Sequence, residues 1–280
     1  MKTAIITLTI GDAYKRMFRK WFAPGWHAYA KCHGIDIVVI EEPIDTSMLA
    51  AHRSSAWQKC ILHRDAKVRE YDQIAWVDAD VRINPKSPNI FENCPLDKVS
   101  AVDAYGIPSR KEHDVILSRL YAKWDDSGNK YIRNLTPMEF HDQFGLKCSH
   151  DHVVQTGVMV FSPDISEHLF EKVYKNYDDR GHASWNYEMR PLSYEILESG
   201  LVNWLNPRFN ISWSEYELYY YPFLSGYPRL GLAVLNMLSL DRIHPRRDCV
   251  HAAFRNSFFL HFAGGSRDYR LINPLKEIAS

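Results

Sequence analysis

The first third of the chain alternates between two hydrophobic patterns, and this alternation constrains the fold more than any other feature. Thr3–Ile10 and Ile35–Ile40 are rich in β-branched residues, which is typical of buried strands. Ala13–Cys32 and Ser54–Glu70 instead place apolar residues at helical spacing. A third strand is predicted at Ile74–Ile83. Strand, helix, strand, helix and strand in this order predict a doubly wound α/β fold, in which helices flank a mostly parallel central sheet.

The rest of the sequence continues the same alternation. Val99–Tyr105 and Val153–Phe161 are predicted strands, and a polar, mainly helical excursion at Arg110–Phe144 separates them. Two helices and a last strand are predicted at Ile165–Tyr177, Tyr187–Ser199 and Phe258–Phe262. Because the chain contains no internal repeat and no low-complexity linker, we expect a single domain.

Composition and charge exclude several classes of function. The 280 residues, 46% of them hydrophobic, are enough to bury a large core. Lys and Arg total 34, as do Asp and Glu, so no net charge attracts nucleic acid or an anionic membrane. We therefore expect no nucleic-acid partner. We also expect no transmembrane segment, because every apolar run is too short to span a bilayer, whereas peripheral contact with a membrane stays open.

Cysteine usage bears on the cellular compartment. The five cysteines are widely spaced and include no Cys-x-x-Cys pair; they are Cys32, Cys60, Cys94, Cys148 and Cys249. Such a pattern argues against both a disulfide framework and a cysteine zinc site. The apolar run at the start of the sequence is also too short for a signal peptide. We therefore expect reduced thiols in a cytoplasmic protein.

Asp78 and Asp80 are the strongest functional signal. They interrupt the third predicted strand near its carboxyl end, and Gly11 follows the first strand at the same edge of the sheet, where such folds bind ligands. Two carboxylates in apolar surroundings need a compensating positive charge. Mn²⁺ or Mg²⁺ supplies that charge and completes its shell with phosphate oxygens, which predicts a metal-bound diphosphate. Alternatively, the two acids cap a turn or pair with Arg53 or Arg82.

Further motifs occur in order along nearly the whole chain. They are Ser55–Lys59, Tyr71–Asp80, Gln155–Phe161, Leu205–Asn210 and His261–Gly265. Together they resemble the GT-A glycosyltransferases, closest to family 8, which includes glycogenin and bacterial galactosyltransferases, and to family 34. The resemblance implies one GT-A catalytic domain over residues 1–280. Residues 1–105 would bind the nucleotide sugar, and residues 106–280 would bind the acceptor and supply a late metal-ligand strand.

The same resemblance assigns roles to individual residues. His261 would be the third protein ligand of the metal beside Asp78 and Asp80, although a histidine in an apolar strand is often a core residue. Thr156 and Gly157 would line the acceptor side. The residues expected at the nucleotide sugar are Thr7, Thr9, Gly11, Tyr14, Lys59, Asp78, Ala79, Asp80, Asp103, Gly264 and Gly265.

Two of these assignments have plain structural alternatives. Lys59 would neutralise phosphate or touch the donor sugar, but it could equally lie on a solvated helix face. Asp103 would bind a sugar hydroxyl, and a turn-capping role explains it as well.

The implied reaction transfers a hexose from a nucleotide diphosphate sugar, with UDP as the expected nucleotide, to a glycan or another hydroxyl acceptor. A metal on the leaving diphosphate acts as the Lewis acid. Glu188 is the first candidate beside the anomeric carbon and Gln155 the second, because Glu188 falls where related retaining families carry Asp-Gln. Retention is therefore expected, although the following Gln is absent here. The alternative for Glu188 is that it caps its helix or pairs there, for example with Arg190.

Two other functions and one other metal site were weighed. A sugar nucleotidyltransferase would need a Gly-rich basic loop after the first strand, and Gly11–Tyr14 is not one. A catalytically inactive sugar-binding protein of the same fold would not need the set Asp78, Asp80 and His261. Cys148–His152 contains metal-binding residue types, but its spacing favours a polar loop over a zinc site.

Overall fold

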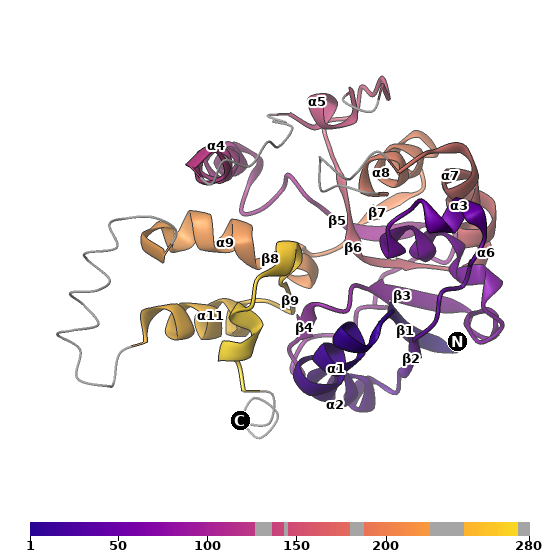
Figure 1. Ribbon diagram of the computed structural model, residues 1–280, viewed down its shortest axis with the longest axis horizontal. Helices are drawn as coiled ribbons and strands as arrows, with labels where there is room; N and C mark the ends of the chain where they lie inside the picture. The colour runs from indigo at the N-terminus through magenta and orange to yellow at the C-terminus, as the bar shows by residue number, and fades with distance from the viewer. Residues whose placement is uncertain (127–135, 143–144, 180–187, 225–243, 274–280) are drawn as a thin grey trace.

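Figure 1 shows the computed structural model, which describes residues 1–126, 136–142, 145–179, 188–224 and 244–273. The strands are β1 (Thr3–Leu8), β2 (Asp36–Ile40), β3 (Gln73–Val77), β4 (Val81–Ile83), β5 (Val99–Asp103), β6 (Val154–Phe161), β7 (Val202–Trp204), β8 (Ile211–Ser212) and β9 (Phe259–His261). The α-helices are α1 (Asp12–Trp21), α2 (Ala23–His33), α3 (Met48–Ala51), α4 (Arg110–Asp126), α5 (Pro137–Asp142), α6 (Pro163–Ile165), α7 (Glu171–Asn176), α8 (Met189–Glu198), α9 (Trp213–Tyr220) and α11 (Pro245–Asn256).

The remaining helical segments are 3₁₀-helical or π-helical. Within the described residues, six are 3₁₀-helical: Ser55–Arg64, Val68–Glu70, Pro207–Asn210, Pro222–Leu224, Ala263–Gly265 and Asp268–Leu271. One π-helical segment, Ser166–Phe170, joins α6 to α7. None of the helices among the described residues has the length and apolar character that crossing a bilayer requires.

The central sheet has the strand order β2-β1-β3-β6-β5-β7. β1 pairs in parallel with β2 and β3, and β5 pairs in parallel with β7. β6 runs antiparallel to both of its neighbours, β3 and β5. Parallel strands need crossover connections, which the helical segments after β1 and β2 provide. The predicted mixed α/β fold with a mostly parallel central sheet is therefore confirmed.

Helices cover both faces of this sheet (Figure 1), and the side chains of each strand alternate between the two cores. On β1, Ile5 packs into the core that α1 and α2 cover, together with Phe18 and Trp26. Its neighbours Ala4 and Ile6 face the opposite core, which the Ser55–Arg64 helix, α7 and α8 cover. The strand is buried on both faces, which explains the continuous apolar run in its sequence.

The predicted strand Ile74–Ile83 is wrong as a single element. It is two strands in two sheets: β3 in the central sheet and β4 in a second sheet of order β4-β9-β8. The chain turns between them at Asp78–Asp80, where Val81 N donates to Asp78 O at 3.1 Å. Nothing local could reveal this division, because β9, the partner of β4, lies more than 170 residues later in the chain.

Most other element predictions hold, with changed boundaries. The predicted helix Ser54–Glu70 is two 3₁₀ segments, and β7 and β8 were not predicted because both are very short. The helical excursion at Arg110–Phe144 contains α4 and α5, although residues 127–135 and 143–144 lie outside the described part. The division into residues 1–105 and 106–280 stays a prediction. All five cysteines are free thiols.

Candidate metal and donor site

The turn between β3 and β4 presents Asp78 and Asp80 at the carboxyl end of β3. Asp78 N donates to Gly157 O at 2.8 Å, which ties the turn to the neighbouring strand β6. The side chains of Asp78 and Asp80 are 28% and 31% exposed, so both carboxylates are open to a ligand from solution. They are turn residues between two buried strands rather than members of one buried strand, which corrects their predicted setting.

His261 reaches this turn through strand pairing. β9 pairs with β4 so that His261 lies opposite Val81, and Phe262 N donates to Asp80 O at 3.0 Å. His261 Nε2 lies 3.2 Å from Asp80 Oδ1 and 3.8 Å from Asp78 Oδ2. One ligand atom from each of the three residues falls within 4.8 Å of the others. The structure thus brings together the three residues predicted as metal ligands.

The arginines weighed as alternative partners of the aspartates have other contacts. Arg82 donates to the carbonyl oxygens of Tyr269 and Ile272, at 3.1 Å and 2.6 Å. Arg53 donates to the carbonyl oxygens of Tyr174 and Tyr177. Both guanidinium groups therefore serve to hold distant loops in place.

The donor set fits a hard divalent cation. Two carboxylates and one imidazole nitrogen suit Mn²⁺ or Mg²⁺, which complete their shells with water or phosphate oxygens. Burial alone lowers the pKa of His261, but the nearby Asp80 carboxylate outweighs it, and the pKa of His261 is raised. Burial likewise raises the pKa of Asp80, and His261 reverses this to a lowered pKa. The aspartates thus attract positive charge here, as a cation site requires.

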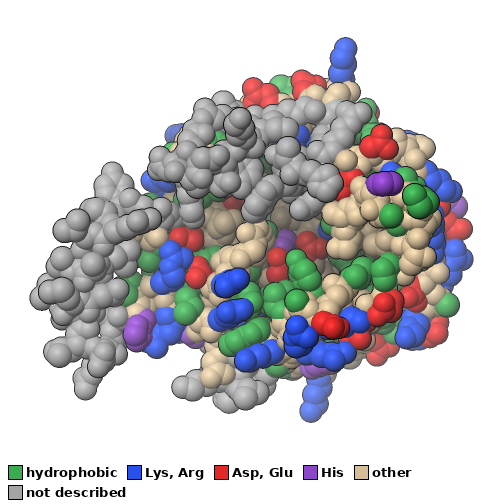
Figure 2. Space-filling model, viewed as in Figure 1, with side chains coloured by type: hydrophobic (Ala, Val, Ile, Leu, Met, Phe, Trp, Pro, Cys, Tyr) green, Lys and Arg blue, Asp and Glu red, His purple; other side chains and the backbone are tan. Residues whose placement is uncertain are grey.

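In Figure 2, acidic and histidine side chains lie together near the middle of the face shown, among hydrophobic side chains. Behind the aspartates, Lys59 lies between two carboxylates. Its Nζ is 3.2 Å from Asp78 Oδ1 and 2.7 Å from Glu188 Oε1, and it donates to Thr156 O at 3.3 Å. Lys59 is only 3% exposed, so the alternative of a solvated helix face is wrong. Burial lowers its pKa, but Asp78 and Glu188 outweigh burial and raise it, so the ammonium stays charged.

Glu188 begins α8 but does not cap it through its side chain. Its carboxylate contacts Lys59 and accepts a hydrogen bond from Thr156 Oγ1 at 3.1 Å. Burial raises the pKa of Glu188, and Lys59 opposes that rise. The side chain of Arg190 lies over the Phe140 ring. Glu188 and Thr156 therefore both contact Lys59. The place of Thr156 on the acceptor side stays a prediction.

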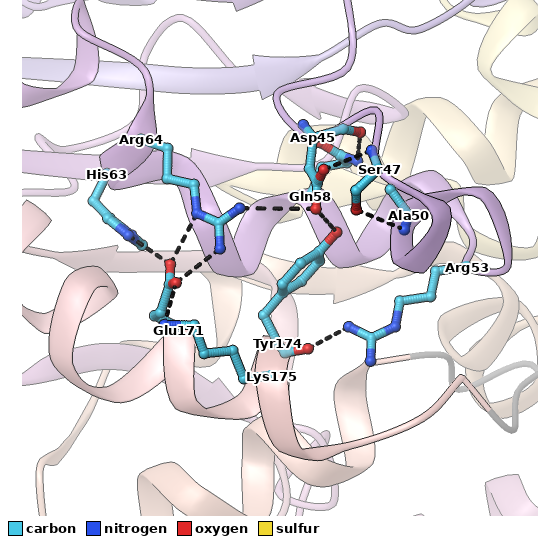
Figure 3. A network of polar contacts seen from close by, with 10 residues as sticks. All are labelled: Asp45, Ser47, Ala50, Arg53, Gln58, His63, Arg64, Glu171, Tyr174 and Lys175. Carbon is cyan, nitrogen blue, oxygen red and sulfur yellow. Dashed lines mark hydrogen bonds and ion pairs between the residues drawn. The ribbon is translucent and has the colours of Figure 1, made fainter.

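A polar network anchors the helix that carries Lys59 (Figure 3). From the Ser55–Arg64 helix, His63 and Arg64 both contact the Glu171 carboxylate of α7, at 2.8 Å and 2.7 Å. Gln58 exchanges two hydrogen bonds with the main chain of Asp45, at 2.9 Å and 3.0 Å. The hydrogen bond from Arg64 lowers the pKa of Glu171 to about 2. These contacts fix the position of the helix that carries Lys59.

Gly157 and Gln155, both on β6, pack against His261. A Cβ atom added at Gly157 would lie 2.8 Å from His261 Nδ1, so only glycine leaves room for the imidazole. Gln155 Oε1 accepts hydrogen bonds from Gly157 N at 2.6 Å and from Asn210 Nδ2 at 3.0 Å. Asn210 Oδ1 in turn lies 3.0 Å from His261 Nδ1. Asn210 was not assigned a role from the sequence, although it ends the Leu205–Asn210 motif.

The residues expected to hold the nucleoside lie at the end of β1 and directly after it, next to the start of the Asp78–Asp80 turn. Parallel pairing of β1 with β3 places their carboxyl ends side by side. Thr7 and Thr9 are buried, and within the described parts of the chain their hydroxyls have no hydrogen-bond partner. Gly11 has a φ of 89°, and Tyr14 is 59% exposed. Their contact with a nucleoside stays a prediction.

The other predicted donor residues lie at or just after strand ends. Asp103 Oδ1 accepts from Tyr105 N at 3.0 Å and Val153 N at 3.2 Å, and Oδ2 lies 2.8 Å from His152 Nδ1. Asp103 therefore caps the turn after β5, and its contact with a sugar hydroxyl stays a prediction. Ala79 lies in the aspartate turn, partly buried against the core. Gly264 and Gly265 both have a φ of 76°, which glycine adopts without strain, directly after β9.

Glu215 was missed from the sequence. It lies in the first turn of α9, three residues after Ser212, which pairs with His261. Burial raises the pKa of Glu215, and the charges of His113 and His261 oppose that rise. In sequence alone it is one acid in an aromatic helix, and only the pairing of β8 with β9 brings it near the histidine.

A second group of metal-binding residue types joins the predicted polar loop before β6 to the end of α8. Cys148, His150 and Glu198 place their ligand atoms within 4.8 Å of one another. His150 Nε2 lies 3.1 Å from Glu198 Oε1, and His150 N donates to Cys148 Sγ at 3.3 Å. A partly exposed ion pair and a local turn account for these contacts.

Comparison with known proteins adds evidence on the fold. No family model and no curated protein matches the sequence. Among solved structures, the bifunctional glycosyltransferase WbbM matches with a TM-score of 0.58 at 13% identity, over 100% of this chain and 50% of that protein. This chain thus corresponds to about half the length of WbbM.

Two further structures are similar over nearly their whole length. A glycosyltransferase involved in glycosylation of the major capsid of PBCV-1 has 16% identity and a TM-score of 0.49, covering 96% of this chain and 98% of that one. The galactosyltransferase LgtC, in complex with donor and acceptor sugar analogues, has 11% identity and a TM-score of 0.44, covering 99% and 94%. The likeness to WbbM, whose TM-score exceeds 0.5, confirms the expected GT-A fold.

Proposed function

We propose that this chain is a metal-dependent glycosyltransferase. It transfers a hexose from a nucleotide diphosphate sugar, with UDP as the nucleotide, to a hydroxyl group of a glycan or another acceptor. The observation that carries the proposal is the convergence of Asp78, Asp80 and His261 beside the buried Lys59–Glu188 pair. The GT-A fold, which hosts this chemistry, supports it.

Asp78, Asp80 and His261 would hold Mn²⁺ or Mg²⁺. The cation would act as a Lewis acid that stabilises the charge developing on the leaving diphosphate. On Asp78, Oδ1 already receives Lys59 Nζ and Trp76 Nε1, the latter at 2.9 Å. The second oxygen, Oδ2, faces His261 and is the one left for a cation. The two oxygens of the Asp78 carboxylate would therefore have different roles: Oδ1 accepts from Lys59 and Trp76, and Oδ2 would bind the cation.

Glu188 is the proposed carboxylate beside the anomeric carbon. As the bond to phosphate breaks, that carbon becomes cation-like, and a negative side chain stabilises it. Lys59 and Thr156 fix the Glu188 carboxylate in one orientation, and Lys59 favours its charged form. Gln155 is the second candidate, although its side-chain oxygen is occupied by Gly157 and Asn210. Retention of configuration rests on the resemblance to family 8.

A cytoplasmic location completes the proposal. The five free thiols support it, because reduced cysteines are usual in that compartment. The balance of 34 basic and 34 acidic residues supports a small anionic donor bound by a local site, with no nucleic-acid partner. Peripheral membrane contact is compatible with this arrangement.

A donor screen tests the function. Purified protein is incubated with UDP-, GDP- and ADP-hexoses in Mn²⁺, and the released nucleotide diphosphate is measured with and without EDTA. We expect metal-dependent release from a UDP-hexose and none from the Asp80→Asn variant. Tight donor binding with no turnover, across a panel of sugar acceptors, would instead identify a sugar-binding protein. Pyrophosphate release from a nucleoside triphosphate and a sugar phosphate would identify a nucleotidyltransferase.

A further inference from the structure

Four groups behind the aspartate turn form a continuous hydrogen-bonded chain. The Gly157 N–H and Asn210 Nδ2 both donate to Gln155 Oε1, and Asn210 Oδ1 faces His261 Nδ1 at 3.0 Å. Asn210 is 1% exposed and His261 4% exposed, so solvent does not substitute for these partners. They come from three separate segments: β6, the end of the Pro207–Asn210 turn, and β9.

The direction of every hydrogen bond in this chain follows from its first member. A main-chain N–H only donates, so the Gln155 atom 2.6 Å from Gly157 N is the amide oxygen. That oxygen also faces the Asn210 amide, which must present its NH₂ group there. The carbonyl oxygen of Asn210 then faces His261, and it can only accept. Nδ1 of His261 therefore carries a proton.

A proton on Nδ1 determines the state of the other ring nitrogen of His261, Nε2. A neutral imidazole with its proton on Nδ1 has its lone pair on Nε2. Nε2 is the atom that faces Asp80 and Asp78. A metal ligand needs that lone pair, and a partner on the other ring nitrogen is the usual way of fixing its orientation.

We propose that Asn210 is a positioning residue, which, with Gln155 and Gly157, holds His261 in the tautomer that presents Nε2 to the metal. We call this hydrogen-bonded chain from Gly157 to His261 the relay. It rests on the proposed function, because it concerns the same metal site. It explains why a buried asparagine stands behind a histidine. It also explains why Gly157 lacks a side chain, because a Cβ there would lie 2.8 Å from Nδ1 and 3.0 Å from Gln155 Oε1.

Two substitutions at one position separate positioning from packing. Asn210→Leu keeps the side-chain size and removes the acceptor for Nδ1–H. Asn210→Asp is the matched control, because its oxygen still accepts that proton although it loses the donor to Gln155. Thermal unfolding is measured first, to establish that both variants are folded before their tautomer and Mn²⁺ affinity are compared.

The first readout is the tautomer of His261 in metal-free protein at alkaline pH, from ¹⁵N chemical shifts of the histidine rings. The His261 signals are assigned by their absence from a His261→Ala sample. We expect a protonated Nδ1 in the wild type and in Asn210→Asp, and a mixed or reversed tautomer in Asn210→Leu. A protonated Nε2 in the wild type would overturn the relay, whatever the protein binds.

The second readout is Mn²⁺ affinity, from loss of the free-ion electron paramagnetic resonance signal on titration. Asn210→Leu should bind Mn²⁺ about 10- to 100-fold more weakly than wild type, and Asn210→Asp within a few-fold of it. Equal affinity of wild type and folded Asn210→Leu would refute the relay and leave the metal site intact. Failure of the wild type to bind Mn²⁺, with the tautomer as expected, would count against the proposed function alone.

Discussion

The ammonium group of Lys59 lies 2.7 Å from Glu188 Oε1 and 3.2 Å from Asp78 Oδ1, so one buried cation joins two carboxylates with different proposed tasks. It pairs with the proposed catalytic carboxylate and with one of the proposed metal ligands. Each of the three side chains also has a further partner, which is Thr156 O for Lys59, Trp76 Nε1 for Asp78 and Thr156 Oγ1 for Glu188. Because the three groups share one polar network, a change at one should be felt at the others.

Replacing Glu188 with Gln tests its proposed role in the reaction. If the charge supports the cation-like transition state, kcat falls by on the order of a hundredfold while donor affinity stays nearly unchanged. Steady-state kinetics and the donor Kd, measured on one preparation, check this. Near-normal turnover with a lowered melting temperature would make Glu188 a structural partner of Lys59 only.

Removing the Lys59 ammonium group from its pair with Glu188 should lower the free energy of unfolding. Lys59→Met leaves Glu188 and Asp78 without their shared partner, and breaking a buried ion pair costs about 3–5 kcal/mol. The double variant Lys59→Met/Glu188→Gln should recover part of this loss, since it no longer buries an unpaired Glu188 charge. Urea unfolding of the single and double variants measures the coupling. Additive losses would show that the pair does not act as a unit.

The glycine beneath His261 gives a third prediction. Gly157→Ala places a methyl group against the imidazole, which has to move away from the aspartates. We expect Mn²⁺ affinity to fall by at least about tenfold with the protein still folded. Gly145→Ala, at an exposed turn where φ is 72° and the added Cβ meets no atom, is the control for a strained glycine replacement that does not touch His261. Unchanged Mn²⁺ binding in Gly157→Ala would mean that His261 is not a ligand.

Acid stability should depend on Glu171. Hydrogen bonds from Arg64, with Lys175 and His63 also facing the carboxylate, lower its pKa from 4.5 to about 2 in the folded protein. A folded pKa below the unfolded one means that this stabilisation is complete above about pH 4.5 and is lost as pH falls toward 2.

The Glu171→Gln variant lacks that dependence. The difference in unfolding free energy between wild type and Glu171→Gln should therefore shrink as pH is lowered from 6 to 3. Glu167→Gln, an exposed carboxylate in the adjoining π-helical segment, serves as the control. A difference that is constant with pH would show that Glu171 acts through packing rather than charge.

The fold could be predicted from sequence to the extent that its signals are local. β1, β2 and β6 were predicted from local runs of apolar and β-branched residues. In β1 such a run is buried on both faces, as Ala4, Ile5 and Ile6 show. β4, β7 and β8 have two or three residues each and carry no periodicity of their own. Their existence depends on partners far along the chain, so no local pattern reveals them.

The residues of the candidate site also differ in how far the sequence alone reveals them. Asp78 and Asp80 were predicted from the paired acids at a strand end and His261 through resemblance, and the β4–β9 pairing explains how they meet. The sequence left Lys59 open between a solvated face and a ligand contact, because the spacing of one lysine on a helix does not reveal a buried carboxylate opposite. Asn210 was missed for a related reason, since its role depends on the atom it faces rather than on its neighbours in sequence.

The central claim is that Asp78, Asp80 and His261 hold a divalent cation that binds a nucleotide diphosphate. Calorimetric titration of UDP into metal-free protein, with and without Mn²⁺, tests it most directly, and Asp80→Ala is the matched variant. The account predicts measurable UDP binding only with Mn²⁺ in the wild type, and loss of that binding in Asp80→Ala. Equal UDP affinity in Mn²⁺ and in EDTA would contradict it.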